Sequence, residues 1–227
     1  MFLQGDFFIY ICNMNINDIY KLVSYLVDKY QGTYLSPDDF NMAINMAQRQ
    51  YLNFLTEETL ETTGRAPGQQ QFVTRGSLSG FLREATLTIS SQLASYPSDY
   101  YKTSAMRTTN DDFLIRKVGA DKLYAYINNP IDAPTLTEPI YTEIGSNFKF
   151  FPNTLTSAKI VYFKQPVDAA WVPLTGTLTY NPSASTQLEW PDNDLNDIIY
   201  RTIGIIGINL KDGDLVRASL TVKNDGQ

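Results

Sequence analysis

The sequence contains no histidine among its 227 residues. Histidine is the usual general base near neutral pH, the partner of serine and cysteine nucleophiles, and the commonest metal ligand. Its absence excludes Ser-His-Asp and Cys-His catalysis, and every zinc site that uses histidine. There is a single cysteine, Cys12, so the chain cannot form an intramolecular disulfide or a cysteine metal cluster. We therefore expect its stability to come from packing and association.

Long apolar runs and an excess of positive charge are also lacking. No stretch approaches the roughly 18 to 20 apolar residues of a membrane helix, and the short run at 7–12 lacks the flanking features of a signal peptide. Lys and Arg number 18 against 24 Asp and Glu, a formal net charge of -6. A phosphate backbone is gripped by clustered Lys and Arg. We expect a soluble, non-secreted protein without a direct grip on a nucleic-acid backbone; an acidic surface that repels DNA and lets it slide past is compatible with this charge.

The part of the chain from residue 14 to residue 60 carries helical patterns. Directly after Met14, apolar residues recur at spacings of 3 and 4, with Asn15 or Asn17 placed to cap the helix. This first stripe is Ile16, Ile19, Val23, Leu26 and Tyr30. A second helix begins with Ser36 as N-cap, Pro37 at the first helical position and Asp39 as the acid of a variant capping box. Its apolar face is Phe40, Ala43, Ile44, Ala47, Tyr51, and Phe54 or Leu55. The two form a predicted helical hairpin, and residues 1–13 are expected to be an extension outside the core.

The middle of the chain contains two kinds of sequence pattern. Residues 61–77 contain turn formers and polar residues with little to bury, which predicts an extended arm. Residues 78–186 show alternating apolar and polar positions, broken by prolines into short strands, with a short helix at 121–128. Residues 187–227 return to helical spacing and are expected to pack on 14–60. The closing face is Leu195, Ile198, Ile199, Ile203 and Ile206. The predicted fold is α+β, with a helical platform from both termini and a central antiparallel β-rich region.

No motif in the sequence carries convincing chemistry. The acidic stretch 192–197 resembles the start of a calcium loop but lacks the required Gly at its sixth position and Glu at its twelfth, and helix N-capping explains it better. A carboxylate pair could hydrolyse a glycoside without histidine. The candidates are Glu138, Glu143, Glu189 and Asp192, although a solvated acidic surface accounts for them more simply. We predict no catalytic, metal or cofactor-binding residues, and no enzyme.

Aromatic residues are the remaining unusual feature, with 15 tyrosines and 12 phenylalanines. Tyrosine is enriched at interfaces because it offers apolar area and a polar tip. The densest group, at 96–101, fits an interface or a core equally well. The arm combines two arginines with an apolar pair, which suits a segment laid on a neighbouring subunit. The predicted inter-subunit residues are Arg65, Phe72, Val73, Arg75, Tyr100 and Tyr101.

The order of these segments resembles that of a known group of structural proteins. The resemblance runs from the opening helix pair at 15–55 through the strand entry at 96–100 to the stretch 160–173. It ends at 188–191, which leads into the closing helix and 207–212. In this order the chain resembles the head-to-tail connector, or ring, proteins of crAss-like and other short-tailed bacteriophages. The resemblance covers most of the chain from Met14 onward.

The resemblance implies a virion protein that works by association. Its expected partners are copies of itself in a cyclic, commonly twelve-fold ring, the portal protein, and neighbouring tail or ring proteins. DNA would pass through without sequence-specific binding. One alternative is a fibre-docking or carbohydrate-binding module of the phage tail. A second is a histidine-free polysaccharide hydrolase.

Overall fold

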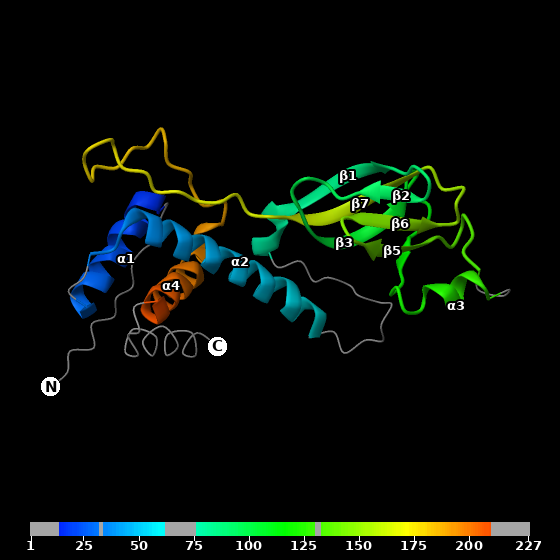
Figure 1. The fold of residues 1–227 in the computed structure, drawn as a ribbon, viewed down its shortest axis with the longest axis horizontal. Helices are drawn as coiled ribbons and strands as arrows, with labels where there is room; N and C mark the ends of the chain where they lie inside the picture. Colours follow the sequence, from blue (N-terminus) through cyan, green and yellow to red (C-terminus); the bar gives the residue numbers. More distant parts are fainter. Residues whose placement is uncertain (1–13, 32–33, 62–75, 130–132, 210–227) are drawn as a thin grey trace. The chain divides into compact units, whose positions relative to one another are not determined.

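The structure is a computed structural model that describes residues 14–31, 34–61, 76–129 and 133–209. Its fold is α+β, as predicted, with helices from both ends of the chain and a β-rich region between them in sequence (Figure 1). The chain divides into two units. One comprises residues 1–58 with 166–227 and is called the helical unit here; the other comprises residues 59–165 and is called the β unit.

In its described residues the helical unit contains three helices: α1 (Ile16–Gln31), α2 (Pro37–Glu61) and α4 (Asp192–Asn209). The predicted caps are confirmed. Asn15 Oδ1 accepts the backbone N–H groups of Asn17 and Asp18, and Ser36 Oγ accepts the N–H of Asp39 while donating to that residue's carboxylate. These bonds satisfy backbone donors that the first turn of a helix leaves open.

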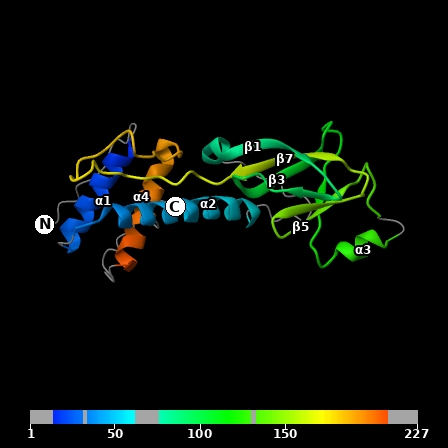
Figure 2. The ribbon, with the colours of Figure 1, turned by 45° about the horizontal axis from the view of Figure 1, so that its top comes forward.

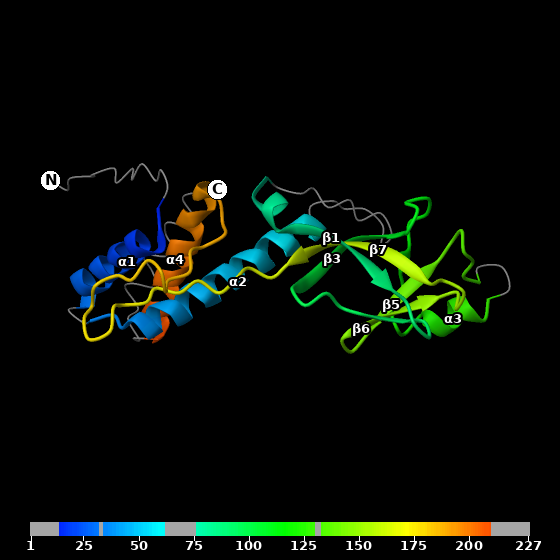
Figure 3. The ribbon, with the colours of Figure 1, turned by 90° about the horizontal axis from the view of Figure 1, so that it is seen from above.

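The predicted apolar faces of the helical unit are buried with one shift, apart from Tyr30, whose side chain lies outside the described part of the chain. On α1 the fully buried position is Val27, whereas Leu26, which the stripe included, is half-buried. Either residue continues a stripe of 3.6-residue period, so spacing alone does not choose between them. The face of α4 is buried over its predicted length, and α4 lies beside α1 (Figure 3). Among the described residues α4 thus packs beside α1, and the packing of the whole segment 187–227 on 14–60 stays a prediction.

The β unit consists of two sheets packed face to face. The first has the order β1-β7-β3, and the second β2-β6-β5-β4. Figure 2 shows β1, β7 and β3 of the first sheet together with β5 of the second. The strands are β1 (Leu82–Thr88), β2 (Leu93–Ser95), β3 (Tyr100–Thr108), β4 (Arg116–Lys117), β5 (Ile140–Ile144), β6 (Asn147–Phe151) and β7 (Ser157–Lys164). A 3₁₀ turn, η1 (Gly76–Phe81), precedes β1, and the short helix α3 (Leu123–Ile127) falls within the predicted range 121–128. Pairing is antiparallel except between β4 and β5.

The core of the β unit draws side chains from both sheets. Inward-facing residues alternate along the strands, as a two-layer packing requires. The cluster contains Leu87, Ile89, Ala94, Met106, Ile115, Tyr141, Phe148, Phe150, Leu155, Ala158, Ile160 and Tyr162. Phe148 is completely buried and contacts the rings of Tyr96, Tyr100 and Tyr141. A smaller cluster under α3 is formed by Val118, Leu123 and Ile140.

The β-rich region ends earlier than the predicted boundary at 186. The last strand, β7, ends at Lys164, and residues 166–190 belong to the helical unit. This returning segment contains only isolated bridges, between Ala170 and Thr186 and between Pro173 and Tyr180. Its alternating, proline-rich sequence resembles a strand, yet its backbone is bound mostly by side chains rather than by a neighbouring strand.

Candidate functional site

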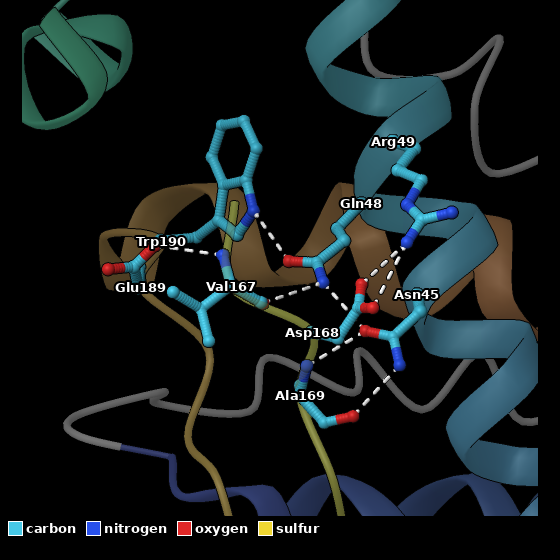
Figure 4. Close-up of polar contacts among 8 residues, drawn as sticks. All are labelled: Asn45, Gln48, Arg49, Val167, Asp168, Ala169, Glu189 and Trp190. Atoms are coloured by element: carbon cyan, nitrogen blue, oxygen red, sulfur yellow. Dashed lines mark hydrogen bonds and ion pairs between the residues drawn. The ribbon is translucent and has the colours of Figure 1, made fainter. Parts of the chain in front are cut away.

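The returning segment is held in an extended form along α2 by asparagine side chains (Figures 3 and 4). Asn45 Oδ1 accepts the N–H of Ala169 at 2.8 Å, and its Nδ2 donates to the carbonyl oxygen of the same residue at 2.9 Å. Asn41 repeats this pair of bonds on Trp171, at 2.7 and 3.0 Å. Each amide thus satisfies both backbone groups of one residue, as a paired β-strand would.

The regularity of these contacts follows from the geometry of the two backbones. Four residues of an α-helix rise about 6 Å, and two residues of an extended chain span about 6.6 Å. Amides four positions apart on α2 therefore meet every second residue of the segment. Gln48 continues the row one turn further and donates to the carbonyl oxygen of Val167 at 3.1 Å. We call Asn41, Asn45 and Gln48 with residues 167–171 the amide clamp.

Gln48 lies at the Val167 end of the clamp and is fully buried, with 0% exposure. Its Nε2 also donates to Asn45 Oδ1 at 2.7 Å, and its Oε1 accepts the indole N–H of Trp190 at 3.3 Å (Figure 4). A buried amide without partners is costly, whereas a fully bonded one fixes the geometry around it. Gln48 therefore joins both ends of the returning segment, at 167 and at 190, to α2.

Charged side chains lie beside the clamp but contribute little to its free energy. Arg49 forms a two-pronged ion pair with Asp168, at 2.8 and 3.1 Å. Both side chains are more than half exposed, at 64% and 60%, and exposed pairs contribute little. On the other side, the Glu189 carboxylate accepts the N–H of Val167 at 3.0 Å. The Val167 backbone is thus bound at both its donor and its acceptor.

Further along, the returning segment is fastened to α1. The Trp171 ring stacks on that of Tyr20 with centroids 4.1 Å apart, and its indole N–H donates to Asn17 Oδ1 at 3.2 Å. Gln187 Oε1 accepts the N–H of Ile16 at 2.7 Å, within the first turn of the helix. Burial raises the pKa of Tyr20 to about 12. One continuous segment therefore contacts both α1 and α2.

A buried hydrogen bond joins α2 to α4. Tyr51 donates its hydroxyl proton to Asp194 Oδ1 at 2.8 Å, and its ring lies 5.1 Å from that of Trp190. Burial, and then the neighbouring Asp194 carboxylate, raise the pKa of Tyr51 well above its ordinary value. Asp194 lies in the first turn of α4, where a carboxylate is favoured by the helix dipole. The acidic stretch at 192–197 thus begins a helix, as the sequence indicated.

The tyrosines predicted at a subunit contact lie at the start of β3. Tyr100 packs against the core cluster of the β unit, with Tyr96 at 4.5 Å and Phe148 at 5.5 Å between ring centroids. Its hydroxyl accepts the N–H of Thr103 at 3.1 Å. Of the two interpretations left open, the structure favours the core for Tyr100, while Tyr101 is half-buried. The other predicted contact residues, Arg65, Phe72, Val73 and Arg75, lie outside the described residues.

The carboxylates considered for glycoside hydrolysis are divided between the two units, with Glu138 and Glu143 in the β unit and Glu189 and Asp192 in the helical unit. Glu143 is paired with Lys117 at 2.7 Å, and Glu189 accepts the N–H of Val167 beside the clamp. Glu138 is exposed next to β5, and Asp192 begins α4. Over the described ranges there is also no group of three or more Asp, Glu or Cys side chains suited to a metal ion.

The amide clamp was not predicted from the sequence. A signal was present, because Asn41, Asn45 and Gln48 follow one another at helical spacing beside the apolar face of α2. Amides at such spacing are ordinary on an exposed helix surface. Their partners are backbone groups about 120 positions away, which leave no pattern in the side chains.

The chain was compared with protein-family models and with curated proteins. No family model matches the chain, and no curated protein matches it. Among the described helices, none is long and apolar enough to cross a membrane. The chemistry of the site consists of neutral amides that bind backbone groups and of indole N–H groups that donate to amide oxygens, which is suited to holding segments of a chain in place.

Proposed function

We propose that this chain is a virion structural protein, a subunit of a head-to-tail connector ring that bridges the portal and the tail of a short-tailed bacteriophage. The observation that carries the proposal is the amide clamp. It joins the two sequence-distant parts of the helical unit through bonds to backbone and buried indole groups. Such a site is suited to mechanical continuity rather than to turnover of a substrate.

A ring subunit needs this kind of continuity. Identical subunits form a ring by repeating a head-to-tail contact until it closes, and each subunit must keep its shape while DNA passes. In the helical unit, the returning segment is bonded to both α1 and α2, and Tyr51 of α2 is bonded to Asp194 of α4, so these bonds support a subunit that keeps its shape. The acidic balance of the chain favours a channel that repels the DNA phosphates.

The proposal is tested by co-assembly with the portal protein encoded by the same genome. The purified full-length chain and portal are mixed, and particles are imaged by electron microscopy. We expect an additional ring-shaped layer on one face of the portal. The Asn45→Leu variant, which breaks the clamp, should give fewer portals with an added layer. The matched control is Asn53→Leu, at an exposed position on the same helix, which should behave like wild type. Portals that stay bare with the wild-type chain would contradict the proposal.

The same preparation separates the alternatives. A fibre-docking or carbohydrate-binding module would retain glycans on an array while leaving the portal bare. A hydrolase would clear bacterial polysaccharide in a gel, and the Glu189→Gln variant would lose that activity. Glu84→Gln, at an exposed position outside the candidate carboxylates, would serve as the control. Glu189 already accepts a backbone bond in the clamp, which does not favour a catalytic role.

A further inference from the structure

The strands at the edges of the two sheets differ in how well they are protected from pairing with another chain. In the second sheet the edge strands β2 and β4 have only three and two residues. In the first sheet β3 is longer, but two register shifts interrupt its pairing with β7. Its outer edge is bonded to the chain that follows, where Thr108 N–H donates to the Phe113 carbonyl and Ile115 N–H to that of Met106. Short edges, bulges and covering segments are the usual protection of a sheet.

β1, the other edge strand of the first sheet, lacks these devices. It has seven residues, contains no proline, and pairs with β7 in one uninterrupted register. Just beyond it, Ile89 N–H donates to the opposite carbonyl oxygen of Thr156 at 2.9 Å. Bonded and non-bonded positions alternate in an antiparallel pair. The odd-numbered residues of β1 therefore direct their backbone groups at β7, and the even-numbered residues direct theirs away from it.

Three of the outward-directed positions form an open edge. The carbonyl oxygen of Leu82 accepts the Arg83 guanidinium at 3.0 Å. The outward backbone groups of 84, 86 and 88 bond to no other residue in the described ranges. These three residues are exposed, and their side chains lie on the outer face of the sheet, because Leu87 is in the core. We call residues 84–88 the open edge. Its free donors and acceptors have the spacing that an added strand requires.

One segment of the chain has the sequence of such a strand. Residues 69–75, called the arm segment here, lie outside the described residues. They are seven in number, contain no proline and stand between Gly68 and Gly76. Their last four residues are Phe, Val, Thr and Arg, of which the first three favour strands. The arm segment also contains three of the inter-subunit residues predicted from the sequence.

One antiparallel register matches the arm segment to the open edge on both faces. With Arg75 opposite Glu84, opposite charges meet on the outer face, where a direct cross-strand pair is stabilising. The same register brings Phe72 opposite Leu87, on the face that carries the buried core cluster. The alternation of the arm segment thus sets its charge and its ring against complementary residues of β1.

We propose that the arm segment of one copy adds to the open edge of the next copy as an antiparallel strand. The inference rests on the proposed function and deepens it, because it names the head-to-tail contact by which the ring would close. Backbone bonds supply the attraction, and the alternating side chains supply the register. Because the two surfaces differ, the contact is heterologous, and its repetition yields a ring or a filament.

The connection between arm segment and β1 favours a neighbouring copy over the same chain. Only the six residues of η1 separate them. At about 2 Å per residue a 3₁₀ turn of this length spans about 10 to 12 Å, whereas paired strands lie about 4.8 Å apart. Parallel pairing would need a crossover of about a dozen residues or more. The arm segment is therefore not placed to pair with its own β1 in either direction.

The test uses proline substitutions in the full-length chain, with association measured by sedimentation. In the inferred register Val73 lies opposite Thr86 and the two exchange backbone bonds, so a proline at either position removes a donor. We expect Thr86→Pro and Val73→Pro each to raise the dissociation constant at least about tenfold, the equivalent of about 1.4 kcal/mol. Thr86→Val keeps the N–H group, and Thr74→Pro removes one that faces away from β1. Both controls should associate like wild type.

Mixing the two weakened variants gives a sharper result. The Thr86→Pro chain keeps its arm segment and the Val73→Pro chain keeps its open edge, so together they should form a 1:1 complex that grows no further. The N–H of Thr86 makes no bond to β7, so its loss should leave the ladder of β1 intact. Val73→Pro lies outside the sheet and keeps the test decisive even if Thr86→Pro lowers the stability of β1.

Cysteine pairs test the register and the choice of copy. In a Cys12→Ser background, a Val73→Cys chain is mixed with a Thr86→Cys chain and oxidised. Opposed bonded residues have Cα atoms about 5.5 Å apart, within the range of a disulfide. We expect a covalent heterodimer, and much less of it when Thr74→Cys replaces Val73→Cys. A chain that carries both the 73 and 86 cysteines and closes on itself as a monomer would assign the open edge to its own arm segment and overturn the inference.

Two further outcomes would also overturn it. Wild-type association that neither proline variant weakens places the ring contact elsewhere, yet leaves the connector function standing. A wild-type chain that stays monomeric at every concentration tested removes the inferred contact, while the portal experiment judges the function separately.

Discussion

The two units of this protein are held together by different means. In the β unit a continuous cluster of aromatic and aliphatic side chains fills the space between two sheets, and most of the polar bonds belong to the strand ladders. In the helical unit, buried amide and tyrosine side chains bind backbone and polar groups more than 100 residues away. The β unit is built from one stretch of chain, whereas the helical unit depends on two.

This difference sets what each unit can tolerate. A packed apolar core is sensitive to lost volume, since the cost grows with the cavity left behind. A clamp of amides is sensitive to lost donors and acceptors, because each removal leaves a buried backbone group without a partner. Substitutions of the two kinds therefore distinguish the units, and hydrogen exchange locates the effect in each.

The largest effect is expected from Ile199→Asp on the buried face of α4. The change puts a charge without a partner where the side chain is 3% exposed, and should lower the free energy of unfolding by roughly 4 kcal/mol or more. Exchange should rise in α1, α2 and α4 first. Asn196→Asp, an exposed position on the same helix, is the control. Unfolding curves that match wild type would mean that the face is not part of the core.

Phe148→Ala tests the other unit. Removing a fully buried ring from the aromatic cluster should cost roughly 3 to 5 kcal/mol, and exchange should rise in both sheets. Phe113→Ala removes the same side chain at an exposed position and should cost little. If the amide clamp loses protection in step with the sheets, the units unfold as one and the comparison fails.

Asn45→Leu breaks the clamp without removing volume. Two backbone groups of Ala169 lose their partner, so we expect a loss of about 2 to 3 kcal/mol and faster exchange at the Ala169 amide. Asn45→Asp keeps the acceptor and loses the donor, so its free energy of unfolding should lie between those of Asn45→Leu and wild type. Equal stability for all three proteins would show that water replaces the amide and that the clamp contributes nothing.

The smallest effect is expected with alkaline pH. Burial raises the pKa of Tyr20 in the helical unit and of Tyr162 in the β unit to about 12, from an ordinary 10.0. The unfolded chain therefore loses these protons first, and the stability they contribute, complete below pH 10, is lost as pH rises towards 12. Urea unfolding across this range checks the slope. Tyr162→Phe, which also removes the bond to Asp99, should reduce the slope without abolishing it, because burial also raises the pKa of Tyr96 and Tyr141 in the same unit. An unchanged slope would contradict the assignment to Tyr162.

Much of this comparison was accessible from sequence. The helix caps at Asn15 and Ser36, the buried faces of α2 and α4 and the short helix α3 follow from local spacing, because a helix repeats its environment every few residues. The β-rich region was recognised from alternation, although its end was placed at 186 instead of 165. The alternating, proline-rich sequence of residues 166–190 would look the same whether its backbone were bonded by a neighbouring strand or, as here, by amide side chains of a helix.

The amide clamp could not be predicted from local sequence patterns, because its partners are backbone groups. Asn41, Asn45 and Gln48 bind backbone atoms, which every residue possesses, so the identity of the partner is not encoded in its side chain. The choice between core and interface for Tyr100 likewise depended on which rings β6 brings beside it. Only the folded arrangement decides such questions.

The central claim is that this chain works by closing into a ring, and images of the purified full-length protein at low salt test it most directly. The account predicts closed rings of one size, with the twelve-fold symmetry implied by the resemblance to connector proteins. Single subunits alone, with no rings either in isolation or on the portal, would contradict it.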